Sequence, residues 1–486
     1  MQAETVPDYK MFIGGAWVTS HSGRTYPAIN PATGQVIALV PKGDAEDVRS
    51  AVDAAKGALE NPGWRQMDPS KRGRLLAKVA QSLRDRLGDF AKLETVNNGK
   101  PLGQAKGDMA MAARHFEYFA GLADKIQGST IPVPGNRLDY TVKEPLGVTA
   151  HIVPWNYPIV MAARSMAPAL AAGNTVVAKP ASFTPLTLLK FAELCKEAGV
   201  PDGVVNVVTG GGDEVGAAIA GHPDVKLTAL TGSVETGIRV MELASTNLSR
   251  IALELGGKNP QIVFEDADLE KAAKGILNGI FTNAGQMCWA GSRLLVESGT
   301  KQRLISMLVE GAEGMKIGNG LSPDTAMGPL VADSQRQRVA RYVDIGTTEG
   351  AKLVTGGRQP EDDSLKDGYF YKPTILEDVD QDMKVAQEEI FGPVLTVTTF
   401  EGVDDAMSKA NDVEYGLWAG VWTKDLGRAH KAAKDLEAGI VAVNEEPVTF
   451  PQTPFGGFKH SGNGAEQGLD AMNTYLRVKN VSVNLD

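Results

Sequence analysis

The chain has 486 residues, of which 43% are hydrophobic and 22% charged, an ordinary composition for a folded protein of about three domains. Its formal net charge of -10 argues against a nucleic-acid or acidic-membrane surface, because either would need a basic patch. Two cysteines cannot form a disulfide framework, and six scattered histidines give no metal-ligand spacing. We therefore expect a cytoplasmic protein without a metal, whose partner is a small molecule.

The beginning of the chain lacks the basic and apolar regions of a secretory signal. The longest apolar stretch, near 159–172, is interrupted by Arg164 and Pro168. A membrane span is therefore not expected.

Residues 147–264 alternate between short β-rich runs and helical segments. Strands are predicted at 148–153, 175–178, 204–208 and 227–230, and the helices that follow them near 159–172, 185–198, 213–220 and 235–246. Strands and helices at this spacing form right-handed parallel crossovers, with helices on both faces of the sheet. The pattern predicts a doubly wound, dinucleotide-binding-like unit.

A second α/β unit is predicted from Asn259 to about Pro454, with strands such as 294–296 and 394–397. Two segments differ from this pattern. Residues 129–142 are typical of a hairpin with a Pro-Gly-Asn turn, and 474–486 of a terminal strand. Both would leave edges that need partners, so we expect a homo-oligomer, either a dimer or a tetramer.

Cys288 is a candidate nucleophile, because it follows a helix-like apolar stretch and lies close to Gly285. A nucleophilic thiol needs a proton acceptor, and the nearest upstream candidate is Glu254. This carboxylate closes an apolar run, where an unpaired charge would be costly. The alternative is that the cysteine is only a small buried hydrophobe, which is our interpretation of Cys195 in the helical segment 188–195.

Polar residues close several predicted strands. Gly232 and Ser233 begin a G-x-x-x-x-G turn into a helix, where backbone amides can bind phosphate. The alternative is that these glycines only allow the backbone conformation of the turn. Asn156 could donate to a developing oxyanion or form an Asx turn. Lys179 could bind a ribose or a phosphate, and the alternative is that it is an ordinary solvated lysine.

Taken together, these pieces resemble the NAD(P)-dependent aldehyde dehydrogenase family over nearly the whole chain. The matching motifs occur in the family's order: Asn30-Pro31-Ala32-Thr33-Gly34, Pro154-Trp155-Asn156, Lys179-Pro180, Gly232-Ser233, Glu254-Leu255-Gly256-Gly257-Lys258, Gly285-Gln286-Met287-Cys288, Glu389-Ile390-Phe391-Gly392-Pro393 and Pro454-Phe455-Gly456-Gly457. Glu254 also precedes Cys288 at the interval that such enzymes show.

The resemblance implies a mechanism. Cys288, as thiolate, attacks an aldehyde carbon, and the oxyanion is held by the Asn156 amide and the Cys288 N–H. After hydride transfer to NAD or NADP, Glu254 activates the water that hydrolyses the thioester to the acid. The implied cofactor-binding residues are Trp155, Lys179, Ser182, Gly232, Ser233, Glu389 and Phe391.

The resemblance also implies an α/β fold with two doubly wound Rossmann-like domains and a small β oligomerisation element. The expected division assigns 1–125 and 148–256 to the cofactor domain, 257–455 to the catalytic domain, and 126–147 and 474–486 to oligomerisation strands.

The implied aldehyde pocket is mostly apolar and bulky, which favours aliphatic or aromatic aldehydes. Its residues are Tyr157, Met161, Arg164, Met287, Trp289 and Phe450. Arg164 keeps a semialdehyde or lactaldehyde dehydrogenase open, because those enzymes also carry an arginine there. Thr282 replaces the second arginine expected of succinic semialdehyde enzymes, so this alternative ranks second.

Ser182 departs from the pattern of many NAD-preferring members, which carry a glutamate three residues after the lysine. Serine removes the charge that would repel a 2′-phosphate, so NADP is expected to be accepted alongside NAD. The alternative is that Ser182 only caps a turn and NAD remains preferred. A cysteine hydrolase would want a histidine partner in a matching motif, and none is present.

Overall fold

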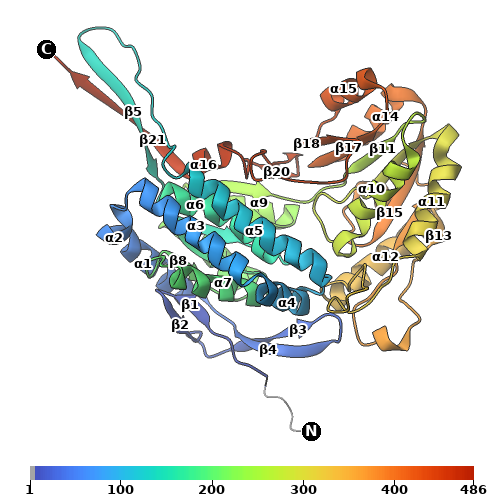
Figure 1. The fold of residues 1–486 in the computed structure, drawn as a ribbon, viewed down its shortest axis with the longest axis horizontal. Helices are drawn as coiled ribbons and strands as arrows, with labels where there is room; N and C mark the ends of the chain where they lie inside the picture. The colour runs from blue at the N-terminus through green and yellow to red at the C-terminus, as the bar shows by residue number, and fades with distance from the viewer. Residues whose placement is uncertain (1–5) are drawn as a thin grey trace.

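Two helix-flanked β-sheets form the body of the molecule in residues 6–486, the part of the chain that this computed structural model describes (Figure 1). The first sheet has eight strands within those residues, in the order β2 (Ala16–Val18), β1 (Met11–Ile13), β8 (Val205–Val207), β7 (Thr175–Lys179), β6 (Val148–Ile152), β9 (Val225–Thr231), β10 (Arg250–Glu254) and β20 (Gly462–Asn463). Neighbours from β8 to β10 are parallel, and β1 and β20 join them antiparallel.

Helices cover both faces of this sheet, because successive strand residues point to opposite sides. In β7, Val176 and Ala178 belong to the core that packs under α3–α7, whereas Val177 packs with Val48 of α1 on the other face. The helices of this unit are α1 (Ala45–Glu60), α3 (Pro69–Asp85), α4 (Leu87–Asn98), α5 (Leu102–Leu122), α6 (Pro158–Ala172), α7 (Leu186–Glu197), α8 (Ala217–Ala220) and α9 (Val234–Ser245). The predicted doubly wound fold is thereby confirmed.

One predicted helix differs from its expected form. The segment near 213–220 begins as a π-helical turn, Gly212–Gly216, and only then becomes α8. The N–H groups of Val215 and Gly216 both donate to the carbonyl of Gly211, which widens the first turn. The sequence pattern does not separate such a turn from an α-helix.

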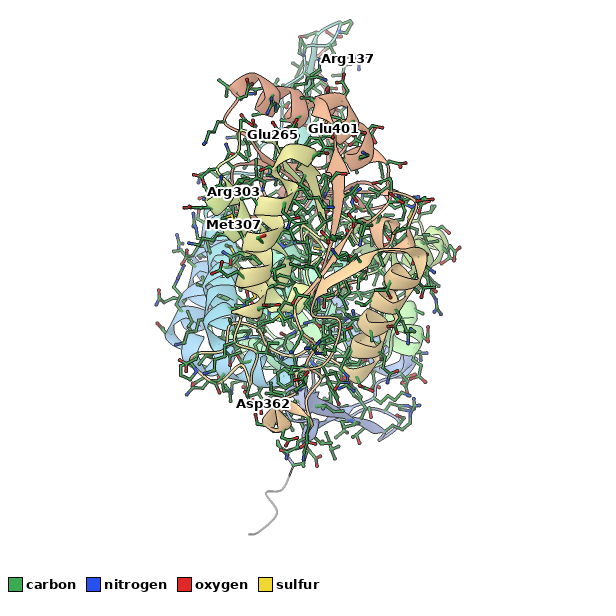
Figure 2. The ribbon with its side chains drawn as sticks, turned by 90° about the vertical axis from the view of Figure 1, so that its right-hand side faces the viewer. Arg137, Glu265, Arg303, Met307, Asp362 and Glu401 are labelled. Atoms are coloured by element: carbon green, nitrogen blue, oxygen red, sulfur yellow. The ribbon has the colours of Figure 1, made fainter. Side chains whose placement is uncertain are left out.

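The second sheet has seven strands in the described chain, in the order β13 (Lys352–Thr355), β14 (Thr374–Glu377), β15 (Val394–Phe400), β12 (Arg293–Glu297), β11 (Pro260–Val263), β17 (Trp418–Trp422) and β18 (Ile440–Val443). All neighbours are parallel except β13, which joins the edge antiparallel. Its helices are α10 (Leu269–Phe281), α11 (Lys301–Glu313), α12 (Asp333–Glu349), α14 (Gly402–Asn411) and α15 (Leu426–Asp435). Figure 2 looks onto this unit, with Arg303 and Met307 marking α11.

A two-stranded arm projects from the body, with Arg137 near its tip (Figures 1 and 2). It consists of β5 (Arg137–Pro145) and β21 (Leu476–Asn484), which pair antiparallel along their full length. Residues 129–131 pair with the other side of β5 through a bridge between Thr130 and Tyr140. The expectation that both segments leave edges needing partners was therefore wrong in part, because each strand covers an edge of the other.

The remaining strands form two small two-stranded sheets, one of β3 (Thr25–Asn30) and β4 (Gln35–Pro41) and the other of β16 (Tyr415–Gly416) and β19 (Phe458–Lys459). The remaining α-helices are short, and they are α2 (Pro62–Arg65), α13 (Lys384–Gln387) and α16 (Asp470–Thr474). Within residues 6–486, no helix combines the length and the apolar character that crossing a bilayer requires.

Candidate active site

A tight left-handed turn precedes Cys288. After α10, Asn283, Ala284 and Gly285 have φ values of 51°, 54° and 71°. Left-handed backbone costs a non-glycine residue about 1 kcal/mol, and such strain concentrates at functional sites. A Cβ on Gly285 would lie 2.1 Å from the carbonyl oxygen of Gly392, so the close approach as well as the φ requires glycine.

Buried amides hold the loop that carries Cys288. Gln286 accepts a hydrogen bond from the Val331 N–H at 2.9 Å, and Asn259 Nδ2 donates to the Cys288 carbonyl at 2.9 Å. Asn156 Nδ2 donates to the Gln286 carbonyl at 2.9 Å. The predicted oxyanion donor therefore lies against the backbone just before the predicted nucleophile.

Two cavities meet at Asn156 and Cys288, which line both of them. The first, of about 230 Å³, is lined by Pro154, Trp155, Asn156, Thr231, Gly232, Ser233, Gly256, Cys288, Gln335, Arg338, Glu389 and Phe391. The second, of about 320 Å³, is lined by Gly107, Asp108, Met111, Asn156, Tyr157, Val160, Met161, Arg164, Cys288, Trp289, Pro447, Val448, Thr449, Phe455 and Gln467.

The first cavity lies at the strand ends of the first sheet, where doubly wound folds bind nucleotides. Ser233 caps the start of α9, and its hydroxyl accepts a hydrogen bond from the Thr236 N–H at 3.3 Å. Glu389 Oε1 accepts from the Gly257 N–H at 3.1 Å, and a Cβ on Gly256 would lie 2.4 Å from Glu389 Oε2. Burial raises the pKa of Glu389 to about 7.

Gln335 and Arg338 also line this cavity and were not predicted. Gln335 Nε2 donates to the Phe391 carbonyl at 2.7 Å, and Arg338 Nη2 donates to the Glu389 carbonyl at 2.7 Å. They hold a turn in which Phe391 has a φ of 62° and its ring meets Trp155 edge-on at 5.2 Å. Both lie on α12, a polar helix that carries none of the motifs, so no sequence signal pointed to them.

Lys179 and Ser182, which were predicted to bind the cofactor, are not among the residues that line this cavity. Lys179 is buried, its Nζ donates to the Pro180 carbonyl at 3.2 Å, and burial lowers its pKa to about 8. The Ser182 hydroxyl donates to the Gly210 carbonyl at 3.1 Å, which is the contact of a turn residue. Nearby Asp213 forms an ion pair with Arg239.

The second cavity is mostly apolar. Tyr157, Val160, Met161 and Arg164 reach it from one face of α6 at helical spacing, so periodicity could have found Val160.

Two predicted residues of the aldehyde pocket lie elsewhere. Neither Met287 nor Phe450 lines the cavity. Met287 is buried in the core of the second unit, and Phe450 is 51% exposed. Their sequence neighbours Cys288, Trp289 and Thr449 line it instead. Proximity in sequence did not resolve which side chain of each loop points inward.

Arg164 is almost completely buried and its charge is already paired. Its guanidinium forms an ion pair with Glu466 and lies 4.3 Å from the centre of the Phe455 ring. Glu466, which comes from late in the chain, was not predicted. The arginine lowers the pKa values of Cys288 and Glu254, opposing the effect of burial on both groups.

Burial dominates the protonation of the two predicted catalytic groups. It raises the pKa of the Cys288 thiol to about 12 and the pKa of Glu254 well above its usual range. Glu254 is 2% exposed at the end of β10, lines neither cavity, and its Oε2 accepts no hydrogen bond from the described residues. Each group is therefore a strong base once it is ionised.

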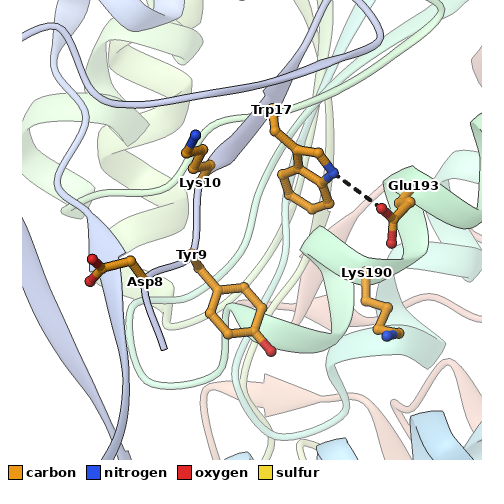
Figure 3. Close-up of a pocket in the computed structure, with 6 residues that line it drawn as sticks. All are labelled: Asp8, Tyr9, Lys10, Trp17, Lys190 and Glu193. Carbon is orange, nitrogen blue, oxygen red and sulfur yellow. Dashed lines mark hydrogen bonds between the residues drawn. The ribbon is translucent and has the colours of Figure 1, made fainter. Parts of the chain in front are cut away.

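Another cavity, of about 340 Å³, lies between the N-terminal strands and α7, where Trp17 Nε1 donates to Glu193 at 3.1 Å (Figure 3). Its lining contains no cysteine. Within residues 6–486, no cluster of three or more His, Cys, Asp or Glu side chains could hold a metal ion.

A known protein family matches almost the whole chain. The profile described as "Aldehyde dehydrogenase family" matches residues 17–481. A betaine aldehyde dehydrogenase of Bacillus subtilis (strain 168) is 45% identical over 98% of this chain and 97% of its own. A hydroxyisobutyraldehyde dehydrogenase of Mycolicibacterium austroafricanum is 44% identical over 98% of this chain and 94% of its own.

Solved structures extend the likeness to three dimensions. A crystal structure of Staphylococcus aureus betaine aldehyde dehydrogenase in complex with NAD+ matches with a TM-score of 0.97 and 42% identity, over 98% of this chain and 95% of that one. The chain described here belongs to the aldehyde dehydrogenase family.

Proposed function

We propose that this protein oxidises an uncharged aliphatic or aromatic aldehyde to its carboxylic acid, with NAD or NADP as hydride acceptor. The observation that carries the proposal is the meeting of a polar and an apolar cavity at Cys288 and Asn156. A reacting carbon held there would lie between a nucleophile, an amide donor and the first cavity. The Staphylococcus aureus relative is described as a complex with NAD+, which supports the cofactor assignment.

The first cavity has the groups that a dinucleotide needs. The N-terminus of α9, a 12-residue helix, favours phosphate, and the buried Glu389 carboxylate can accept hydrogen bonds from ribose hydroxyls. Trp155, Gly232, Ser233 and Phe391 also line this cavity and would contact the dinucleotide. Lys179 and Ser182 do not line it, and we propose that they bind the part of the cofactor that extends beyond it. When bound, the nicotinamide supplies the acceptor for a hydride.

The chain's own residues supply the remaining chemistry. The Cys288 thiolate forms a bond to the aldehyde carbon, and the resulting oxyanion accepts hydrogen bonds from the Asn156 amide and the Cys288 N–H. Once oxidation has produced the thioester, Glu254 takes a proton from water as the water adds to that carbon. The C–S bond then breaks, the electron pair returns to sulfur, and the acid leaves.

The apolar wall supports an uncharged substrate. Met111, Val160 and Met161 contribute aliphatic surface, and Trp289 and Phe455 meet edge to face at 5.6 Å. Arg164 gives no support to a carboxylate-binding role, because Glu466 already neutralises it. The semialdehyde alternative therefore remains second. Lactaldehyde carries no carboxylate, so this ion pair does not bear on it, and it is kept as a second candidate for the assay below.

An aldehyde panel with both cofactors tests this function. Purified protein is assayed by the formation of reduced cofactor with a short aliphatic aldehyde, an aromatic aldehyde, succinic semialdehyde, lactaldehyde and betaine aldehyde. We expect the highest kcat/KM among the first two substrates. A preference for succinic semialdehyde or betaine aldehyde would contradict the substrate class, and no oxidation of any aldehyde would contradict the activity.

We further propose that the protein is a homodimer or homotetramer assembled through the β5–β21 arm. The outer edge of β21 has no strand partner among the described residues, and Val478 on it is 65% exposed. Alongside this, we propose the division into domains stated above, with 456–473 added to the first domain because β20 and α16 pack there. A monomeric mass in light scattering at micromolar concentration would contradict the assembly.

A further inference from the structure

One short segment contacts each member of the turn Trp155–Tyr157. It comprises Asn98, the last residue of α4, and the two residues that follow. Asn98 Nδ2 donates to the Trp155 carbonyl at 2.8 Å, and Lys100 Nζ donates to the Asn156 carbonyl at 2.9 Å. Lys100 Nζ also lies 3.9 Å from the centre of the Tyr157 ring. Trp155 lines the first cavity, Tyr157 lines the second, and Asn156 lines both.

Lys100 is buried with its charge paired inside the protein. Its side chain has no exposed area, and its Nζ lies 2.5 Å from Asp108 Oδ2 and 3.8 Å from Glu94 Oε1. Removing an ammonium from water is costly unless partners compensate it closely. Burial raises the pKa of Glu94 to about 7, while Lys100 holds the pKa values of both carboxyl groups below what burial alone would produce.

The backbone of Asn156 is held from two directions. Asn283 Nδ2, from the left-handed turn before Cys288, donates to the same Asn156 carbonyl at 3.1 Å. This carbonyl therefore joins the Lys100 cluster to the loop of the nucleophile. The direction of the Asn156 side-chain amide depends on where its own peptide is fixed, and an oxyanion donor is effective only when it is fixed before the reaction.

We propose that Lys100 is a positioning residue that fixes the Asn156 peptide so that its amide faces the reacting oxygen, and that Asp108 holds Lys100 in place. The inference rests on the proposed function, because it assigns Lys100 a task through Asn156. Asp108 also lines the second cavity, so the pair connects the substrate wall to the oxyanion donor.

Replacing the lysine by an apolar residue of similar length tests the proposal. Lys100→Met should lower kcat about 10- to 100-fold, part of the loss expected for removing an oxyanion donor, and leave the cofactor KM within about threefold. An unchanged kcat in a folded Lys100→Met variant would overturn the proposal.

A double variant separates positioning from charge compensation. Lys100→Met alone leaves Asp108 buried without its partner and can unfold the protein. Lys100→Met/Asp108→Asn removes the closer ion pair and leaves Glu94, whose raised pKa lets it become neutral by binding a proton. It should recover the thermal midpoint without recovering kcat. Recovery of kcat in the double variant would show that Lys100 only neutralises Asp108, and would overturn the proposal.

Asn97→Ala is the matched control for lost stability. Asn97 is also buried, but its amide bonds the Phe183 carbonyl at 2.9 Å and the Leu186 N–H at 3.2 Å instead of the Trp155–Tyr157 turn. This variant should lose thermal stability and keep kcat within about twofold. A loss of kcat as large as in Lys100→Met would overturn the specific role.

A double-mutant cycle with Asn156→Ala decides the route. If Lys100 acts through Asn156, Lys100→Met should lower the kcat of the Asn156→Ala enzyme by no more than about twofold. A full additional loss would overturn the proposal. Asn156→Ala with wild-type kcat would instead contradict the proposed function of Asn156, and a wild-type protein that oxidises no aldehyde would contradict the activity itself.

Discussion

The two cavities that share Cys288 are built in different ways. The first is lined mainly by strand ends and turns, where Gly232 and Gly256 bring backbone close to the space that is proposed for the cofactor, with Gln335 and Arg338 of α12 completing it. The second is lined by side chains from α5, α6 and the late segment 447–467. A site made of backbone geometry is confined to short motifs, whereas a side-chain wall assembled from distant segments leaves no local signature. Each side was predicted only in part, because Lys179 and Ser182 lie off the first cavity and Met287 and Phe450 lie off the second.

The largest expected effect is at the residue common to both cavities. Cys288→Ala should lower aldehyde oxidation by at least about a thousandfold, because no other group described in the site can form the thioester. Cys195→Ala is the matched control, since Cys195 is fully buried in α7 and packs in the core. It should keep kcat within about twofold. Equal loss in both variants, measured as steady-state rates, would contradict the assignment.

The next effect separates the acylation and hydrolysis steps. Glu254→Gln should still give a rapid burst of reduced cofactor, followed by turnover reduced about 100-fold or more, because the amide cannot activate water. The raised pKa of Glu254 means that its ionised fraction, and with it the wild-type hydrolysis rate, increases as pH rises. The variant should lack this rise. Stopped-flow measurements of reduced cofactor separate the burst from the later turnover. Loss of the burst would show that Glu254 is needed to activate Cys288.

A smaller effect tests whether the two cavities act independently. Trp289→Ala should change the ratio of kcat/KM between an aromatic and a short aliphatic aldehyde by about tenfold, since it removes one wall of the second cavity. The cofactor KM should not change. Glu389→Gln is the reciprocal variant and should raise the cofactor KM while leaving the aldehyde ratio constant. If both variants alter both constants, the division of the site is wrong.

The smallest effect concerns cofactor choice. Ser182→Glu should weaken NADP binding more than NAD binding, because a carboxylate would repel a 2′-phosphate. In the structure the Ser182 hydroxyl already donates to Gly210, so its contribution to NADP binding requires this contact to break. Specificity constants for both cofactors measure the shift. A wild-type enzyme that does not use NADP would identify Ser182 as a turn residue only.

Periodicity and motifs predicted four of the eight described strands of the first sheet, β6 to β9, and the helices α6 to α9 that follow them, because each reflects a local rule of side-chain alternation or turn chemistry. They failed where the outcome depended on distant partners. The pairing of β5 with β21 joins segments more than 300 residues apart, as does the contact of Arg164 with Glu466. Lys100 gave no signal either, because its contact with the Asn156 carbonyl, 56 residues further along the chain, forms only in the folded protein.

The last part of the chain completes structures that begin near its start. β20 adds an edge to the first sheet, Glu466 pairs with Arg164, and Tyr475 is buried in the core beneath α6. During translation, the first unit would therefore be synthesised long before these groups leave the ribosome. Until they do, Arg164 lacks its carboxylate partner and the substrate cavity lacks part of its wall. The order of synthesis thus delays the completion of the cavity beside Cys288 until residues 447–467 have been made.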